Sequence, residues 1–365
     1  MSHLLYFIFL THSCNLACTY CGEVEHPILS LPREISYSFS QLESFLMDDP
    51  NPIIVFYGGE PLLRITTLEK IMDRLKNATF LLQTNGYYLA RIPPSYLNRF
   101  QTILISIDGR KQINDLYRGK GTYNHIRRNM KIIKENDYKG DLIARMTVSS
   151  NSDIYQEVKS LLSLRNPAFN HVHWQLDVIW SDKEQWHDFN SWVQNIYNPG
   201  IAALIEEWVV QMSQSNQVLG IVPFIGIMKT LLSGISSKLR CRAGMDAFAI
   251  QTNGEIYACP VCPEFSDFKV GNLFTSRSDK IRNQLLIRSP CVECEIYAIC
   301  GGRCLFANYH NFWDDDFFAV CKTVKFLIDE LKRVKPVIEE MIKESKLSFE
   351  MFDYPKFNNS CEIIP

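Results

Sequence analysis

The residues with the most reactive chemistry in this sequence are its cysteines, and their positions are unevenly spread. Of 12 cysteines, three lie at positions 14, 18 and 21, none lies between residues 22 and 240, and nine follow. Thiols grouped in this way bind metals or carry out redox chemistry when they are kept reduced. The grouping therefore predicts more than one metal or redox site.

The first group, Cys14, Cys18 and Cys21, has the spacing C-x3-C-x2-C. A 4Fe–4S cluster used only for electron transfer normally has four cysteine ligands. Three cysteinates therefore favour a cluster with one iron open to a substrate or cofactor. The alternative is a zinc site with a fourth ligand such as His12 or His26, although zinc motifs more often use C-x2-C pairs.

The elements that must position these cysteines alternate between short apolar runs and stretches with helical spacing. The apolar runs lie at residues 4–10, 53–57, 79–82, 103–107, 142–148 and 171–176. Apolar strands that alternate with helices predict a parallel sheet covered on both faces. Six such units predict an α/β fold, a partial (β/α)6 barrel of the TIM type.

Two predicted strand ends carry the candidate chemistry. In barrel-like folds, chemistry sits at the C-terminal ends of strands, and Cys14 follows the first predicted strand. The second strand leads into Gly58–Gly59–Glu60–Pro61. Glycines allow the backbone to approach a ligand closely, and a carboxylate can hold an ammonium group. We therefore expect one site at these two strand ends.

Together with several later motifs, these residues resemble the radical S-adenosylmethionine (SAM) superfamily. The later motifs are Gln83–Thr84–Asn85–Gly86, Ser106–Ile107–Asp108–Gly109, Gly119–Lys120–Gly121–Thr122–Tyr123 and Arg145–Met146–Thr147–Val148. The resemblance implies that Cys14, Cys18 and Cys21, with Tyr20 beside the last of them, hold a 4Fe–4S cluster whose open iron binds SAM. Reductive cleavage of SAM then gives a 5′-deoxyadenosyl radical that takes a hydrogen atom from the substrate.

The resemblance also implies contacts to SAM outside the cysteine loop. Gly58, Gly59 and Glu60 belong to the methionine-binding motif, in which Glu60 meets the amino group. Ser106 would meet the ribose or carboxylate, and Arg145 the carboxylate. The alternatives are a capped strand end for Ser106 and an ordinary ion pair for Arg145.

The second cysteine group resembles the SPASM extension of one branch of that superfamily, which implies two auxiliary 4Fe–4S clusters and three clusters in all. Auxiliary cluster I would be held by Cys241, Cys259 and Cys304, with Cys262 as the candidate fourth ligand. Auxiliary cluster II would be held by Cys291, Cys294, Cys300 and Cys321. If Cys262 does not complete cluster I, an open iron there could bind substrate. A zinc ribbon is the alternative, because the group contains two C-x2-C pairs.

These motifs predict the domain organisation. We expect a radical SAM core at residues 1–205, a helical bridge at 206–240, a small cysteine-rich α+β SPASM domain at 241–325, and a C-terminal helix and tail at 326–365.

Composition and charge narrow the class of protein. With 46% hydrophobic and 21% charged residues, the chain can bury a sizeable core. Its net charge of −2 disfavours a nucleic-acid partner. The apolar run at 4–10 is too short to span a membrane and lacks the basic residues and cleavage site of a secretory signal. We therefore expect a cytoplasmic protein with no membrane partner.

The resemblance implies oxidation or cross-linking of a peptide or protein substrate, with electrons from an external donor such as flavodoxin or ferredoxin. Pro260 follows Cys259 where sulfatase-maturing enzymes have an aspartate, which disfavours formylglycine formation. The cluster loop begins at residue 14, so we expect a separate leader-binding protein if a leader is recognised. The alternatives are a related enzyme acting on a small molecule and a non-enzymatic zinc-binding interaction protein.

The remaining candidates have weaker signals. Asp108 and Asp177 are the candidate acid or base groups; Glu206 and Glu207 share that chemistry, and structural roles are commoner for all four. His171 and His173 are expected to be satisfied strand-end histidines. Core packing is favoured for the aromatic residues Trp174, Trp180, Trp186 and Trp192. Cys361 is expected to be a bystander thiol.

Overall fold

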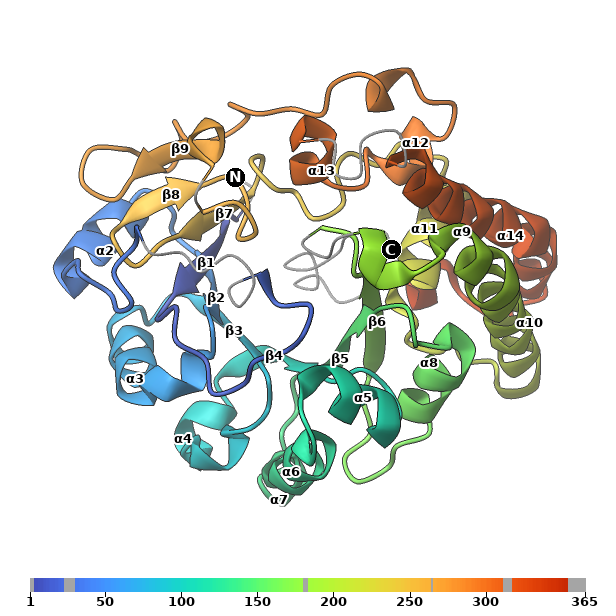
Figure 1. Ribbon diagram of the computed structural model, residues 1–365, viewed down its shortest axis with the longest axis horizontal. Helices are drawn as coiled ribbons and strands as arrows, with labels where there is room; N and C mark the ends of the chain where they lie inside the picture. The colour runs from blue at the N-terminus through green and yellow to red at the C-terminus, as the bar shows by residue number, and fades with distance from the viewer. Residues whose placement is uncertain (1–2, 23–29, 180–182, 264, 311–316, 354–365) are drawn as a thin grey trace. The chain divides into compact units, whose positions relative to one another are not determined.

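The computed structural model describes residues 3–22, 30–179, 183–263, 265–310 and 317–353 (Figure 1). The chain divides into two compact units, each assembled from three separate stretches. Unit 1 comprises residues 1–106, 114–142 and 241–286, and unit 2 comprises residues 107–113, 143–240 and 287–365.

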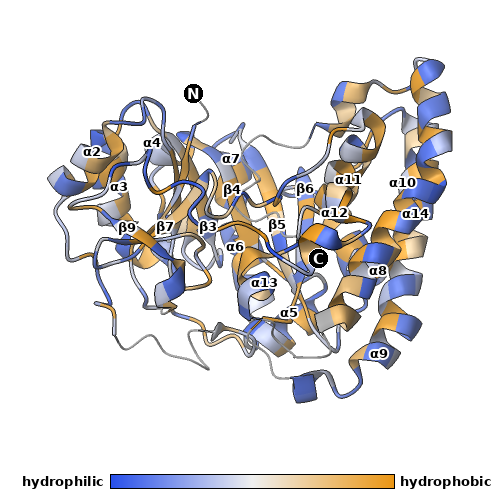
Figure 2. Cartoon of the chain, turned by 90° about the horizontal axis from the view of Figure 1, so that it is seen from above, coloured by the Kyte–Doolittle hydropathy of each residue, from blue (hydrophilic) through white to orange (hydrophobic). Residues whose placement is uncertain are grey.

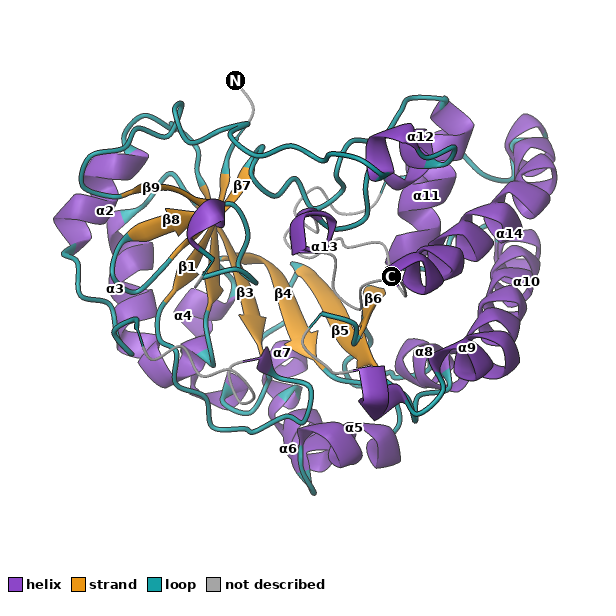
Figure 3. Cartoon of the chain, turned by 45° about the horizontal axis from the view of Figure 1, so that its top comes forward, coloured by secondary structure: helices purple, strands orange, loops and turns teal. Residues whose placement is uncertain are grey.

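Unit 1 is built on parallel strands that follow one another along the chain. These are β1 (Leu5–Phe9), β2 (Ile53–Tyr57), β3 (Thr79–Thr84) and β4 (Phe100–Ser106), in the order β4-β3-β2-β1. Every residue of β1 is buried, as expected for a parallel strand covered on both faces. Figure 3 shows these strands side by side, with helices along their outer side.

The covering helices of unit 1 are amphipathic or short. They are α2 (Phe39–Leu46), α3 (Ile65–Arg74), α4 (Pro94–Leu97), α6 (Thr122–Asn129) and α7 (Lys131–Glu135), while α5 (Lys111–Arg118) begins in unit 2. Helix α3 buries Leu68, Ile71 and Met72 on one face. Helix α2 begins at a capping box between Ser38 and Gln41.

Three further strands extend the free edge of β1. Strand β7 (Ala247–Ile250) pairs with β1 in parallel, and β8 (Glu255–Tyr257) and β9 (Lys269–Asn272) follow it in antiparallel order. Cys241 precedes β7 and Cys259 follows β8, so the start of the second cysteine group flanks strands of the same sheet as β1. The pairing between β7 and β1 joins residues far apart in the sequence, and no local pattern indicates it.

Unit 2 combines one parallel strand pair with a group of helices. Strand β5 (Asp141–Val148), whose first two residues belong to unit 1, pairs with β6 (His171–Leu176). The helices are α8 (Ile154–Leu162), α9 (Phe189–Trp192), the π-helical η4 (Val193–Tyr197), α10 (Asn198–Ser215), α11 (Val222–Ser233), α12 (Tyr297–Cys300), α13 (Leu305–His310) and α14 (Phe317–Lys343). Helices α10 and α11 both pack against α14. Figure 2 shows hydrophobic and hydrophilic residues alternating along α10 and α14, as their amphipathic sequences require.

The structure confirms the α/β class and the parallel strands at all six predicted apolar runs. Helices α10 and α11 overlap the segment 206–240 that is expected to be helical, and α14 overlaps the expected C-terminal helix. The four-part domain organisation stays a prediction. Among the described residues, no helix is both long enough and apolar enough to cross a membrane.

Candidate cluster and cofactor site

The cysteine loop of unit 1 is fixed to the second strand by backbone hydrogen bonds. Beyond the end of β1, the Leu10 N–H donates to the Tyr57 carbonyl at 3.0 Å. The N–H groups of Gly59 and Glu60 then donate to the carbonyls of Thr11 and Ser13, both at 2.9 Å. The pairing of β1 with β2 therefore continues past both strands, up to the residue before Cys14.

The two glycines of the second strand end are needed for this close approach. A Cβ atom at Gly58 would overlap the carbonyl oxygen of Thr11, and one at Gly59 would overlap that of Ser13. Gly58 also has a φ of +135°, which other residues rarely adopt. The neighbour that requires glycine is thus the backbone of the cysteine loop, whereas the sequence pattern suggested a bound ligand.

Glu60 lies at the junction of β2 and β3 and is fully buried. Its carboxylate accepts hydrogen bonds from the Leu62 N–H (2.9 Å), the Thr84 hydroxyl (2.8 Å) and the Asn85 N–H (2.8 Å). Burial raises the pKa of this carboxyl to about 7, against the lowering by the three hydrogen bonds. Glu60 therefore holds two strand ends together, and its contact with a methionine amino group stays a prediction.

Thr84 and Asn85 connect the end of β3 to the cysteine loop. The Asn85 side-chain amide lies 3.7 Å from the Cys14 Sγ and donates to the Asn15 side chain at 2.9 Å. The Leu16 N–H also points at the Cys14 Sγ, at 3.4 Å. N–H groups directed at a sulfur favour its thiolate form, which is the form that binds iron. These contacts fit a cluster ligand at Cys14.

Aromatic contacts hold the second half of the loop. The Thr19 N–H donates to the Tyr117 carbonyl at 3.0 Å, and the rings of Tyr20 and Tyr117 lie 5.7 Å apart. The Arg118 guanidinium lies 5.4 Å from the centre of the Tyr20 ring. No sequence pattern indicates these roles of Tyr117 and Arg118, although the two residues directly precede the Gly119–Tyr123 motif.

Unit 1 thus brings together the cysteine loop, Gly58–Glu60 and the end of β3. Cys14 is exposed, and Cys18 and Cys21 are half-buried, so their sulfurs are accessible to an incoming ligand. Ser106 is half-buried at the C-terminal end of β4, as the sequence predicts. His26, the alternative zinc ligand, lies outside the described residues.

Arg145 lies on β5 in unit 2 and is a buried cation with neutral partners. Its guanidinium lies 2.9 Å from the His173 Nδ1 and donates to the Gln175 Oε1 at 2.6 Å. Because arginine only donates, the His173 Nδ1 must accept. The buried Arg145 Nε has no hydrogen-bond partner, and no ion pair of Arg145 occurs in the described part of the chain. This arrangement fits the prediction that Arg145 meets a carboxylate.

The two candidate acid or base groups of unit 2 are buried and hydrogen-bonded. Asp108 accepts from the Thr147 N–H at 3.0 Å, and Asp177 accepts from the Ser149 hydroxyl at 3.0 Å. Both hydrogen bonds have a structural role, because they connect segments at the ends of strands. Catalysis by Asp108 or Asp177 stays a prediction. Glu206 pairs with Arg333 and Glu207 with Lys159, as expected for solvated carboxylates.

The tryptophans are part of the core of unit 2. Trp174, Trp186 and Trp192 are all buried, and their indole N–H groups donate to the Tyr197 hydroxyl and to the carbonyls of Asp177 and Ser152. This confirms core packing for these three. Trp180 and Cys361 lie outside the described residues.

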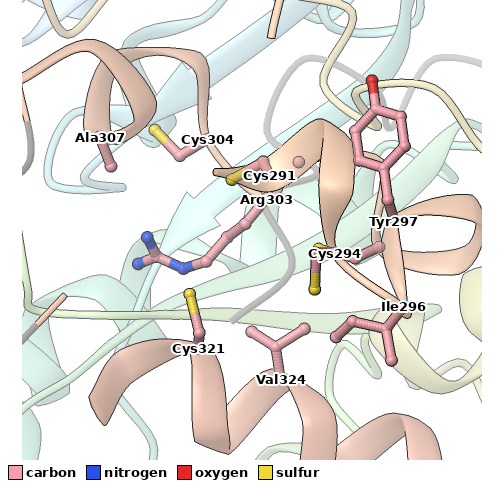
Figure 4. Close-up of a pocket in the computed structure, with 11 residues that line it drawn as sticks. Cys291, Cys294, Ile296, Tyr297, Arg303, Cys304, Ala307, Cys321 and Val324 are labelled. Carbon is pink, nitrogen blue, oxygen red and sulfur yellow. The ribbon is translucent and has the colours of Figure 1, made fainter. Parts of the chain in front are cut away.

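A pocket in unit 2 gathers the cysteines assigned to auxiliary cluster II. Its lining includes Cys291, Cys294, Cys300 and Cys321, and it encloses about 430 Å³ of empty space, part of it open to solvent. The residues come from the segment that contains α12 and from the first turns of α14. In Figure 4 the sulfurs of Cys291, Cys294 and Cys321 lie around a common space.

The chemistry of this pocket fits a group held by sulfur. Five cysteines line it: the four assigned to auxiliary cluster II, and Cys304, which the sequence assigns to auxiliary cluster I. Cysteine sulfurs are the ligands that iron–sulfur clusters take. The residues of the pocket therefore fit a 4Fe–4S cluster.

The residues assigned to auxiliary cluster I are divided between the units. Cys241, Cys259 and Cys262 belong to unit 1, and Cys304 belongs to unit 2. Cys259 and Cys262 are buried, and the Cys262 Sγ lies 3.1 Å from the Cys259 carbonyl oxygen. This ligand set, including the part played by Cys262, stays a prediction.

Comparison with known families agrees with the geometry. Residues 8–164 match the model of the radical SAM superfamily, a range that includes the cysteine loop and all strands from β2 to β5. The chain belongs to the radical SAM superfamily. It is a radical SAM enzyme, and the relatives below, together with its C-terminal cysteine spacing, support the SPASM branch.

Relatives of this radical SAM enzyme extend the likeness beyond the matched range. The mycofactocin maturase MftC of Mycolicibacterium smegmatis is 24% identical over 329 residues, which cover 82% of this chain and 77% of that protein. The solved structure of anSMEcpe with bound AdoMet and Cp18Cys peptide covers 92% of this chain and 100% of its own, with a TM-score of 0.72 and 19% identity. Streptococcus suis SuiB, solved with its precursor peptide SuiA, covers 83% of this chain and 72% of its own, with a TM-score of 0.55 and 16% identity. These two structures show the shared fold.

Proposed function

We propose that this radical SAM enzyme removes a hydrogen atom from a residue of a peptide or protein and leaves it oxidised or cross-linked. The observation that carries the proposal is the presence of two cysteine sites of different kinds in one chain. A three-cysteine loop is fixed to the end of a parallel sheet, and a separate pocket is lined by five cysteines, four of which are assigned to auxiliary cluster II. The structures of anSMEcpe and SuiB with peptides support a peptide substrate.

In this proposal the three-cysteine loop holds the cluster that binds SAM. When bound, the cluster and SAM together supply the radical that removes the hydrogen atom. The chain's own residues hold the loop in place: Gly58 and Gly59 allow the backbone contacts, and Asn85 directs its amide at the Cys14 sulfur. Arg145 offers its unpaired Nε and its positive charge to the carboxylate of SAM.

The auxiliary pocket fits the oxidative part of the proposal. Removal of a hydrogen atom leaves a substrate radical, which must lose one more electron to become a closed-shell oxidised product. Cys291, Cys294, Cys300 and Cys321 hold the group that accepts this electron. The proposal includes a cytoplasmic location, an external donor such as flavodoxin or ferredoxin, and a separate leader-binding protein.

The test is anaerobic reconstitution with iron and sulfide. The chain is expected to bind about 12 irons for three 4Fe–4S clusters. Addition of dithionite and SAM is expected to release 5′-deoxyadenosine, and Cys18→Ala is expected to abolish that release. A preparation that binds only zinc, or a Cys18→Ala variant that still cleaves SAM, would contradict the proposal.

The peptide part of the proposal needs its own measurement. Short precursor peptides encoded beside the gene are incubated with the reconstituted enzyme and SAM, and their masses are compared before and after. We expect a loss of two hydrogen atoms that depends on SAM. Efficient SAM cleavage with no change in any such peptide, but with conversion of a small molecule, would instead establish the small-molecule alternative.

A further inference from the structure

We propose that Arg303 provides the positive charge that sets the reduction potential of the cluster held by Cys291, Cys294, Cys300 and Cys321. The proposal rests on the auxiliary cluster II of the proposed function and adds to it a residue that binds no iron. Arg303 directly precedes Cys304 and lines the same pocket as the four cysteines.

The side chain of Arg303 extends into the cysteine pocket. Figure 4 shows its guanidinium beside the Cys321 sulfur, while the Cys304 sulfur points away from Cys321. Arg303 is only 7% exposed, and its buried Nε has no hydrogen-bond partner among the residues that the structure describes. None of the ion pairs within the described ranges contains Arg303. A buried cation without an acidic partner is costly, so an anionic group in the pocket would stabilise it.

The backbone before Arg303 also serves the cysteine pocket. Gly301, Gly302 and Arg303 have φ values of +76°, +95° and +47°. This left-handed turn brings the backbone N–H groups of Gly302 and Arg303 near the Cys300 sulfur, where they favour negative charge on it. Arginine rarely adopts a positive φ, so the surrounding structure imposes this conformation. One short turn thus supplies two N–H donors and one full charge to the same site.

The guanidinium of Arg303 belongs to the pocket as a whole. Cys291, Cys294, Cys300 and Cys321 all line the pocket that Arg303 lines. Its positive charge therefore stabilises negative charge across the pocket rather than at one sulfur.

The expected consequence concerns the electron that the site accepts. Each cysteinate brings a negative charge, and one-electron reduction adds another. Net charge, hydrogen bonds to sulfur and exposure are the levers that set cluster potentials. A buried guanidinium beside the cluster favours the reduced form, so Arg303 makes the site a better electron acceptor.

The test is an EPR-monitored redox titration of the full-length, anaerobically reconstituted chain. Cys14, Cys18 and Cys21 are replaced by alanine in every sample, so that only auxiliary signals remain. Arg303→Gln removes the charge, and Arg303→Lys keeps it. Arg333→Gln is the matched control, because it removes an exposed arginine from α14, the helix that carries Cys321. Iron is determined for every sample.

We expect Arg303→Gln to lower the equilibrium constant for one-electron reduction about tenfold, or about 59 mV, at unchanged iron content. Arg303→Lys and Arg333→Gln are expected to keep the parent potential. An unchanged potential in Arg303→Gln, or an equal shift in Arg303→Lys, would overturn the proposal. If Arg303→Gln loses iron, the potential of Arg303→Lys decides. A potential equal to that of the parent supports the proposal, and a shift of about 59 mV overturns it. A parent chain that binds no auxiliary cluster overturns the proposed function itself, which is a distinct result.

Discussion

The carboxyl group of Glu60 lies where water does not reach, between the ends of β2 and β3. All three of its hydrogen bonds come from the chain itself, two from backbone N–H groups and one from a hydroxyl. The motif residue that the family resemblance assigns to a ligand thus serves the architecture that holds the cysteine loop. Its buried charge leads to a prediction about stability.

Between pH 5 and 8, we expect the free energy of unfolding of the chain without iron to fall relative to that of Glu60→Gln. The folded pKa of about 7 lies above the ordinary value of 4.5. The native state therefore keeps a proton that the unfolded state has released, and this stabilisation is lost as the pH rises through 7. The difference is on the order of 3 kcal/mol. Urea unfolding at both pH values measures it, and equal pH dependence in the two proteins would contradict it.

A second residue-scale prediction concerns Arg145. Arg145→Gln is expected to weaken SAM binding about tenfold or more, because a charge-assisted hydrogen bond contributes about 1.5–3 kcal/mol. His173→Leu removes the acceptor that orients the guanidinium, so it is expected to weaken binding less. Equilibrium dialysis of labelled SAM on reconstituted protein measures both. The control is Arg165→Gln, because the Arg165 guanidinium donates to the nearby carbonyls of Leu162 and Leu164. Equal losses in control and variant would refute the assignment.

At the scale of elements, the cysteine loop behaves as a continuation of the strand pair β1–β2. Gly58→Ala is expected to push the loop out of place, with loss of the cluster it holds and of roughly one third of the total iron. Gly121→Ala is the matched control, because Gly121 has a φ of +86° but no atom within 4 Å of its added Cβ. The Gly121→Ala variant therefore has backbone strain at a positive φ but no steric overlap with a neighbouring atom. Iron analysis and 5′-deoxyadenosine release report the result, and a Gly58→Ala variant with full iron would disprove the prediction.

Sequence patterns predicted the elements with local signals and missed those that depend on distant partners. Six apolar runs identified β1–β6, because a strand buried on both faces must be continuously apolar. Helix α5 is only eight residues long, so its helical spacing of Ile113, Leu116 and Tyr117 is a short signal, and β7 carries no mark of the strand it pairs with. Within the candidate site, spacing identified the cysteines. The contact of Arg145 with His173 and the turn before Arg303 required the folded chain, because both depend on residues that the sequence does not place side by side.

The whole molecule carries its two described cysteine sites in different compact units. Cys294→Ala is therefore expected to lose roughly one third of the iron and the oxidation of the peptide, while SAM cleavage at the N-terminal site continues. Iron content, 5′-deoxyadenosine release and peptide mass are measured on the same preparation. Loss of SAM cleavage together with all iron would show that the two sites depend on each other.

The parallel pairing of β1 with β7 has a consequence for how the protein is made. The edge of β1 is covered only after β7 has been synthesised, because Leu5 pairs with Ala247. Translation at about 5–20 residues per second makes this delay on the order of 10–50 s. During this time a fully apolar strand presents an unpaired edge, which is a template for aggregation. Expression at a lower temperature and with abundant chaperones is therefore expected to raise the yield of soluble chain before any iron is supplied.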